Sequence, residues 1–250
     1  MLNNSTVQKL NEMKLNVMAQ TFTRQLEDRD MSDLSFEERV GLMVDAEWAA
    51  RKSSRLKRLI RRAGFVFPNA CLEDIEYHTD RKLDKPLITR LGTCTYVEEH
   101  HNIILLGATG SGKTWISNAL GNAACRNFCN VLYKRLPELF AVLAVAKVQG
   151  TYSKVIKQYK KVKLLILDEW LLYPLKESEA RDLLEIAEGR HKQASTVFCS
   201  QFEVGGWHQK IGDPTMADAI VDRIVHDSYT LIISGTDSMR KRKGLKIQAG

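Results

Sequence analysis

Apolar residues recur at helical spacing through the first third of the chain, which predicts helices that each bury one face. A helical segment is expected to begin near Ser5. A longer helix follows, because Ser35 and Glu38 have the spacing of a capping box and the pattern continues to about Arg62. We therefore predict a small all-helical N-terminal domain over residues 1–68.

From about residue 100 the pattern changes to short apolar runs that alternate with helical segments. Such runs are typical of strands buried on both faces, and a repeated strand–helix order favours a parallel sheet covered by helices. The expected strands are 102–107, 130–134, 163–169, 195–201 and 229–234. The second predicted strand is followed by two helices that break at Gly150. The fold class is therefore α/β, with an α/β domain over 100–240, a connector over 69–99 and a basic tail over 241–250.

Composition is that of an ordinary globular protein, with 44% hydrophobic and 27% charged residues. No apolar run reaches the roughly 18 residues of a membrane helix, and the first residues have no signal-peptide core. The five cysteines form no CxxC pair, and the histidines form no zinc motif. We expect a cytoplasmic protein without membrane contact. The net charge of +7 hints at nucleic acid.

Residues 107–114 read GATGSGKT and match the phosphate-binding pattern GxxxxGK[ST] between a predicted strand and a predicted helix. Backbone N–H groups of such a loop surround phosphate oxygens. Lys113 is expected to reach the β- and γ-phosphates, and Thr114 to bind Mg²⁺. The predicted nucleotide-binding residues are Gly107, Ala108, Thr109, Gly110, Ser111, Gly112, Lys113, Thr114 and Trp115.

The apolar strand 163–169 ends in Asp168 and Glu169. Asp168 is the second expected Mg²⁺ ligand, with Thr114 the first. Glu169 is predicted to polarise a water for attack on the γ-phosphate, which metal binding alone does not need. The pair therefore favours hydrolysis of ATP over simple binding, with ATP and Mg²⁺ as cofactors. A polar residue at the end of the next strand, Ser200 or Gln201, is placed to touch the γ-phosphate or that water.

Over nearly its whole length the chain resembles the IstB-type transposition helper ATPases, relatives of DnaC-type helicase loaders in the initiator branch of the AAA+ superfamily. The resemblance rests on segments that extend beyond the phosphate-binding loop. They are LSFEERVGLMVDAEWAARKSSRLKRLIRRAGF, LLGATGSGKT, LLILDEW, LYPL, GWHQKIGDP, AIVDRIVH and SGTDSMR. The resemblance implies that residues 100–240 are an AAA+ ATPase domain whose lid is absent or minimal.

The resemblance also implies roles for single residues. Arg223, in the element DRI, is expected to act in trans as an arginine finger on ATP held by a neighbouring subunit. A salt bridge within the chain is the alternative interpretation. Ser200 or Gln201 takes the place of the sensor 1 residue, although CSQ here replaces the usual Thr-Ser-Asn. Arg240 is the candidate for sensor 2, in a terminal motif one residue longer than usual.

Helper ATPases of this type bind target DNA, assemble on it with ATP and recruit the transposase of the same element. We accordingly expect a homo-oligomer that binds duplex DNA without reading its sequence. A basic helix face supports phosphate-backbone contact, although a solvated face is the alternative. The candidate DNA-binding residues are Arg51, Lys52, Arg55, Lys57, Arg58, Arg61, Arg62, Lys134 and Arg135.

Three other functions compete with a transposition ATPase. A helicase loader acting in DNA replication would prefer single strands, and it is the principal alternative. A small-molecule kinase would need neither Glu169 nor Arg223. A scaffold that binds ATP without turnover would be insensitive to replacement of Glu169 by glutamine.

Overall fold

The computed structural model describes residues 2–28, 31, 33–235 and 238–243 of the chain. By contacts within the chain it divides into two compact units, Met1–Arg58 and Leu59–Gly250. The long helix α3 (Phe36–Ala63) runs through the boundary. The predicted end of the helical domain at residue 68 remains a prediction.

The first unit is helical, as expected, but its first element differs from the prediction. The helix α1 (Leu2–Glu12) begins before Ser5, and a turn separates it from α2 (Asn16–Glu27). The turn includes Lys14 at φ 60°. The apolar pattern continues across this turn, so the pattern alone joined the two helices into one segment.

A buried carboxylate fixes the start of α2. Glu47 of α3 accepts hydrogen bonds from the backbone N–H groups of Val17 and Met18, at 3.0 and 3.1 Å. These donors have no partner inside their own helix, and a negative charge is favourable at a helix N-terminus. Glu47 also pairs with Arg51 at 2.7 Å.

The predicted start of α3 is confirmed by its capping box. The Ser35 N–H donates to Glu38 at 2.8 Å, and the Glu38 N–H donates to the Ser35 hydroxyl at 3.3 Å. The predicted end near Arg62 also agrees with the observed end at Ala63.

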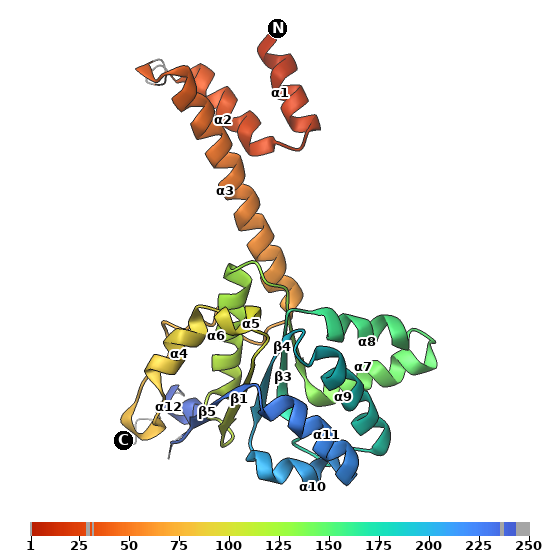
Figure 1. Ribbon diagram of the computed structural model, residues 1–250. Helices are drawn as coiled ribbons and strands as arrows, with labels where there is room; N and C mark the ends of the chain where they lie inside the picture. The colour runs from red at the N-terminus through yellow and green to blue at the C-terminus, as the bar shows by residue number, and fades with distance from the viewer. Residues whose placement is uncertain (1, 29–30, 32, 236–237, 244–250) are drawn as a thin grey trace, which may run out of the picture. The chain divides into compact units, whose positions relative to one another are not determined.

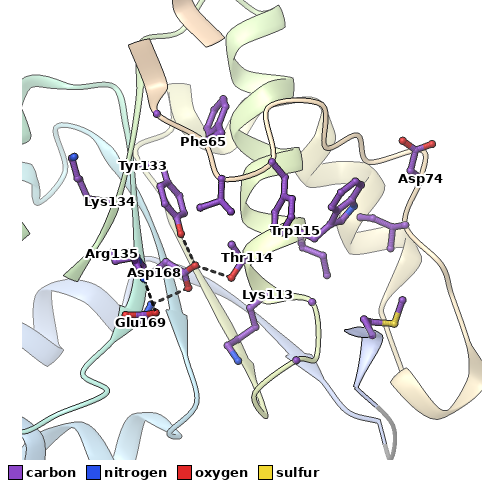
Figure 2. Close-up of a pocket in the computed structure, with 18 of the residues that line it drawn as sticks. Phe65, Asp74, Lys113, Thr114, Trp115, Tyr133, Lys134, Arg135, Asp168 and Glu169 are labelled. Carbon is purple, nitrogen blue, oxygen red and sulfur yellow. Dashed lines mark hydrogen bonds and ion pairs between the residues drawn. The ribbon is translucent and has the colours of Figure 1, made fainter. Parts of the chain in front are cut away.

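The second unit is built on a five-stranded parallel sheet of order β2-β3-β4-β1-β5 (Figure 1). Its strands are β1 (Asn102–Gly107), β2 (Val131–Arg135), β3 (Leu164–Trp170), β4 (Ser195–Ser200) and β5 (Ser228–Ile233). All five predicted strands are present. Since the strands are parallel, the segments that follow β1, β3 and β4 meet at one edge of the sheet, where Figure 2 shows a pocket.

Helices cover both faces of this sheet (Figure 1). On one side lie α4 (Lys85–Gly92), α5 (Thr95–Glu98) and α6 (Lys113–Arg126). On the other lie α7 (Leu136–Val148), α8 (Tyr152–Lys161), α9 (Glu177–Arg190), α10 (Trp207–Ile211) and α11 (Pro214–Val225). Helix α12 (Met239–Lys243) and the short 3₁₀ turns η2 (Thr79–Arg81) and η3 (Val204–Gly206) complete the described elements. The predicted break between two helices at Gly150 is confirmed, with Gly150 at φ 66°. The predicted α/β class is also confirmed.

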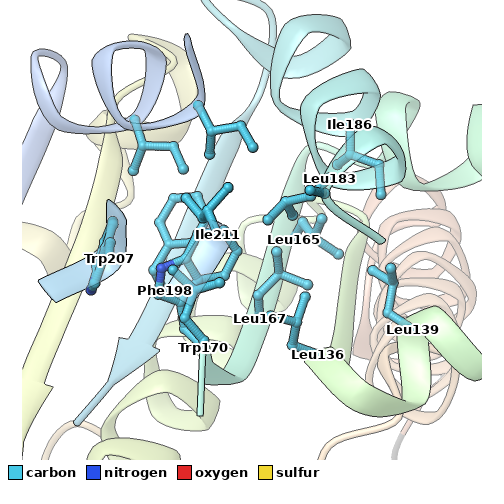
Figure 3. Close-up of a cluster of buried hydrophobic side chains, with 14 of the residues drawn as sticks. Leu136, Leu139, Leu165, Leu167, Trp170, Leu183, Ile186, Phe198, Trp207 and Ile211 are labelled. Atoms are coloured by element: carbon cyan, nitrogen blue, oxygen red, sulfur yellow. The ribbon is translucent and has the colours of Figure 1, made fainter. Parts of the chain in front are cut away.

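Alternate residues of the strands supply the core beneath α7 to α11. Its centre is aromatic: the ring of Trp170 lies 4.5 Å from that of Phe198 and 5.5 Å from that of Trp207, centroid to centroid (Figure 3). Edge-to-face contacts of this kind stabilise beyond simple burial. The core includes Leu167 and Trp170 of β3 and so supports the end of that strand, which carries Asp168 and Glu169.

The predicted connector, residues 69–99, contains regular structure and lies within the second unit. It includes η2, α4 and α5. Asp84 caps α4 by accepting from the Leu87 N–H at 2.9 Å, and Ile88 and Leu91 are buried. Among the described helices, none is both long and apolar enough to cross a membrane.

Candidate nucleotide-binding site

The predicted phosphate-binding loop joins β1 to α6. Gly112 immediately precedes α6 with φ 98°, a conformation that favours glycine. A Cβ added to Gly107 would lie 2.6 Å from the Ile233 carbonyl oxygen, so only glycine fits there. These constraints give the loop the shape that its sequence predicts.

Lys113 is buried at the base of the loop, with 8% of its surface exposed. Its Nζ donates to the carbonyl oxygens of Gly107 at 2.6 Å and Ala108 at 2.9 Å. Burial lowers the pKa of Lys113, while nearby Cys199 and Asp168 oppose that shift. The ammonium group is therefore held at the loop by neutral acceptors, which phosphate oxygens can replace.

Asp168 is the centre of a hydrogen-bonded group at the end of β3 (Figure 2). Its Oδ2 accepts from Thr114 Oγ1 at 2.7 Å and from the Tyr133 hydroxyl at 2.8 Å. Burial is the largest cause of the raised pKa of Tyr133, and the negative charge of Asp168 is the next. The Tyr133 hydroxyl therefore keeps its proton and donates it in the hydrogen bond to Asp168. Because hard oxygen ligands suit Mg²⁺, the Thr114–Asp168 pair fits such an ion.

The Glu169 backbone departs from the regular strand. Its φ is 55°, and the pairing of β3 with β4 shifts register between Leu167 and Trp170. The Glu169 N–H donates to Asp168 Oδ1 at 2.9 Å, and its carboxylate lies 3.7 Å from Arg135. Positive φ is uncommon for a residue other than glycine and recurs at functional sites. This turn lets both acids line one cavity.

A cavity of about 720 Å³ adjoins these polar groups, and part of its wall is apolar. Phe65, Val66, Phe67 and Trp115 contribute to that wall, and the Phe67 and Trp115 rings lie 5.4 Å apart. The size suits a nucleotide-sized ligand, and the wall suits a planar base. Sequence reasoning included Trp115 but missed residues 65–67, whose only signal was the aromatic run GFVF before Pro68.

Arg81 is a second residue that sequence reasoning missed. It comes from η2, is 4% exposed and lines the same cavity. One of its amino groups, Nη2, donates to the Ser111 carbonyl oxygen in the phosphate-binding loop at 2.8 Å. No motif marks this arginine in the sequence.

The two sensor candidates occupy different environments. Ser200 is fully buried, donates to the Phe202 carbonyl oxygen at 2.8 Å and accepts from the Trp207 indole at 3.2 Å. Gln201 is exposed and accepts from the Thr109 hydroxyl at 2.7 Å. Of the two, only Gln201 contacts the phosphate-binding loop.

Arg223 lies on α11, and it is absent from the lining of this cavity. It donates to the Ala219 carbonyl oxygen at 2.7 Å and pairs with Glu188 at 3.3 Å. The side chain is 31% exposed. The sensor 2 candidate, Arg240, falls in α12, but its side chain lies outside what the structure describes.

The predicted DNA-binding residues come from two elements, α3 and β2. Seven of them are exposed on α3: Arg51, Lys52, Arg55, Lys57, Arg58, Arg61 and Arg62. Arg51 is engaged with Glu47 and with the Lys14 carbonyl oxygen, at 2.7 and 2.8 Å. Lys134 and Arg135 are the last two residues of β2, and they line the cavity described above. Residues 244–250 of the predicted basic tail lie outside the described residues.

The fold has counterparts among solved structures. A replication initiator DnaA bound to AMPPCP and single-stranded DNA matches with a TM-score of 0.56 and 21% identity, over 69% of this chain and 52% of that one. The DnaC helicase loader matches with a TM-score of 0.55 and 15% identity, over 66% of this chain and 97% of that one. At such identities the likeness shows a shared fold and nothing more.

Sequence relatives are closer. A protein of Sinorhizobium fredii described as an insertion sequence ATP-binding protein is 40% identical over 246 residues, which span 98% of this chain and 100% of the relative. The family described as IstB-like ATP binding protein matches residues 8–247. The chain therefore belongs to the IstB-like ATP-binding protein family, as the resemblance predicted.

Proposed function

We propose that this protein is a DNA-binding ATPase that serves the transposase of an insertion sequence. One observation carries the proposal: Lys113, Thr114, Asp168 and Glu169 line a single cavity in a member of the IstB-like family. The insertion-sequence relatives favour transposition over helicase loading as the process served.

ATP is the proposed ligand of this cavity, with its phosphates at the loop after β1. Lys113 would exchange its two carbonyl acceptors for β- and γ-phosphate oxygens. Thr114 and Asp168 would hold Mg²⁺, which neutralises charge on the phosphates when bound. The apolar wall at residues 65–67 would receive the adenine base.

Hydrolysis is proposed to use Glu169 as the residue that orients and polarises the attacking water. Gln201 is the better placed of the two sensor 1 candidates, because it already contacts Thr109 of the loop. Arg223 is proposed to act on a second subunit's ATP, for which it would have to leave its exposed pair with Glu188. Hydrolysis would then depend on assembly.

Duplex DNA is proposed to organise that assembly, with the transposase of the same element as the protein partner. The basic residues on α3 are exposed, which supports contact with the phosphate backbone. They carry no base-reading motif, so we propose that binding does not depend on the DNA sequence. Binding of this kind weakens steeply with salt.

Electron microscopy tests the assembly. The protein is imaged with duplex DNA and ATP, with either component alone, and as Lys113→Ala with both. We expect ordered oligomers on DNA only for the wild type with both components. Isolated monomers in every condition would contradict the assembly, and ordered binding to single strands alone would support the helicase-loader alternative.

The ATPase assignment has its own test. Hydrolysis is measured with DNA for the wild type and for Glu169→Gln, a substitution that keeps size and removes the charge. We expect at least a hundredfold lower rate in the variant, with ATP binding retained. A wild type that is no faster than this variant would show that the protein binds ATP without turnover.

A further inference from the structure

Arg81 is a buried cation at the nucleotide cavity. It is 4% exposed, and its two amino groups donate to the carbonyl oxygens of Glu76 and Ser111, at 2.6 and 2.8 Å. Among the residues that the structure describes, Arg81 is in no ion pair. The neighbouring carboxylate of Asp80 is bound by Arg242 instead.

A charge in such a place is costly. Burial is the largest cause of the lowered pKa of Arg81, and the positive charge of Arg242 lowers it further, while the nearby carboxylates of Glu76 and Asp80 oppose part of that shift. Buried charges in folded proteins are normally paired with an opposite charge. An anion that enters the cavity would add negative charge beside Arg81, and a nucleotide brings phosphates to the adjacent loop.

The bond from Arg81 to Ser111 also sets the direction of a loop peptide. In a trans peptide the C=O and N–H groups point in opposite directions. Because Arg81 holds the Ser111 carbonyl oxygen, the N–H of Gly112 is turned the other way. Loops of this type bind phosphate through such N–H groups. The guanidinium comes so close that a Cβ on Gly112 would lie 3.0 Å from its Nη2.

The backbone of Arg81 is itself fixed to the sheet. Its carbonyl oxygen accepts from the Ser234 N–H, just beyond β5, at 3.1 Å. The C-terminal helix adds a further tie, because the Met239 N–H donates to the Gly110 carbonyl oxygen at 2.8 Å. Arg81 is therefore hydrogen-bonded both to the phosphate-binding loop, at Ser111, and to the residue that follows β5, Ser234.

We propose that Arg81 is a positioning residue for nucleotide binding, which holds the Ser111–Gly112 peptide and provides positive charge for the β-phosphate of the nucleotide. This inference rests on the proposed function, since it requires that the cavity binds a nucleotide. It adds a residue that lies outside the phosphate-binding motif and comes from the segment before the sheet.

The test compares Arg81→Met, which removes the charge at similar length, with Arg81→Lys, which keeps the charge but loses the planar group that spans two carbonyl oxygens. Arg90→Met is the matched control, because Arg90 is exposed and its guanidinium contacts Tyr229. Dissociation constants for ATP, ADP and AMP are measured by calorimetry, and thermal unfolding without nucleotide is measured for each variant.

We expect Arg81→Met to weaken ATP and ADP binding at least tenfold and AMP binding less than threefold. Arg81→Lys should lie between Arg81→Met and the wild type, and Arg90→Met should match the wild type. Wild-type affinities in Arg81→Met, or equal losses for all three nucleotides, would overturn the inference, since equal losses indicate a general disturbance of the site.

If Arg81→Met does not fold, the Arg81→Lys variant provides the test. The inference requires that Arg81→Lys lose more affinity for ADP than for AMP. Equal affinities of Arg81→Lys and the wild type would then overturn the inference. A wild type that binds none of the three nucleotides would refute the proposed function itself, which separates the two failures.

Discussion

The Arg135 guanidinium lies 3.7 Å from the carboxylate of Glu169, so the proposed catalytic glutamate is paired with a basic side chain at the end of the neighbouring strand. Both side chains are partly exposed, at 49% and 36%. Ion pairs between exposed side chains are weak. Arg135 donates a hydrogen bond to Glu138 at 2.9 Å, and its charge beside Glu169 makes that carboxylate a weaker acceptor for the attacking water.

Replacing Arg135 with alanine should therefore raise hydrolysis without DNA, by at most about fivefold because the pair is weak. Since Arg135 is also a predicted DNA contact, stimulation by DNA should fall in the same variant. Steady-state phosphate release with and without duplex DNA measures both effects. Arg181→Ala, which removes an exposed pair with Glu177, is the control and should leave both rates unchanged. A lower basal rate in Arg135→Ala would contradict this view of the pair.

Tyr133→Phe tests the support of the Asp168 carboxylate. The substitution keeps the ring and removes a 2.8 Å hydrogen bond to a buried charge, and such bonds contribute about 1.5–3 kcal/mol. We expect a lower melting temperature without ligand, and a smaller deficit with Mg²⁺ and ADP, because the ion would partly replace the lost interaction. Tyr173→Phe, at a 65% exposed tyrosine, should behave as the wild type. An equal deficit with and without ligand would show that Tyr133 does not support the metal site.

We expect substitution of Ser200 to lower stability and substitution of Gln201 to lower ATPase activity. Ser200→Ala removes an acceptor of the Phe202 N–H and of the Trp207 indole, which keeps its bond to the Phe202 carbonyl oxygen, and should cost about 1–3 kcal/mol of unfolding free energy. Gln201→Ala should leave stability unchanged and slow ATP hydrolysis about tenfold. Urea unfolding and ATPase rates on the same two variants measure the separation. A stable, slow Ser200→Ala together with a fully active Gln201→Ala would reverse the assignment.

These contrasts show what the sequence could and could not predict. The phosphate-binding loop and the Asp168–Glu169 pair were predictable because each is a local pattern with an apolar strand before it. Both lie at the same edge of the sheet because parallel strands align their carboxyl ends. That rule needs no knowledge of side-chain packing.

The remaining cavity residues were not predictable, because their place depends on long-range packing. Arg81 is thirty positions from Ser111, its partner in the loop, and sits in a segment without periodicity. Tyr133 reads as an ordinary aromatic residue of a buried strand, although its hydroxyl meets Asp168. The Glu188 partner of Arg223 is likewise 35 positions away, so no local pattern identified it as the partner in a salt bridge.

Arg223 offers a test of whether the site is completed by a second subunit. Arg223→Ala should bind ATP normally and hydrolyse it about a thousandfold more slowly in the presence of DNA, because arginine fingers contribute at least that factor. Glu188→Ala, which removes the partner of Arg223 within the chain, should retain hydrolysis or raise it.

Mixing two inactive variants separates a trans role from a local one. A subunit with Arg223→Ala keeps its own Glu169, and a subunit with Glu169→Gln keeps its own Arg223. If Arg223 acts across the interface, some interfaces in a mixed assembly combine an intact glutamate with an intact arginine. An equimolar mixture on DNA should then hydrolyse ATP much faster than either variant alone. Phosphate release that merely equals the mean of the two separate rates would place the effect of Arg223 within its own subunit, through its contacts with Ala219 and Glu188.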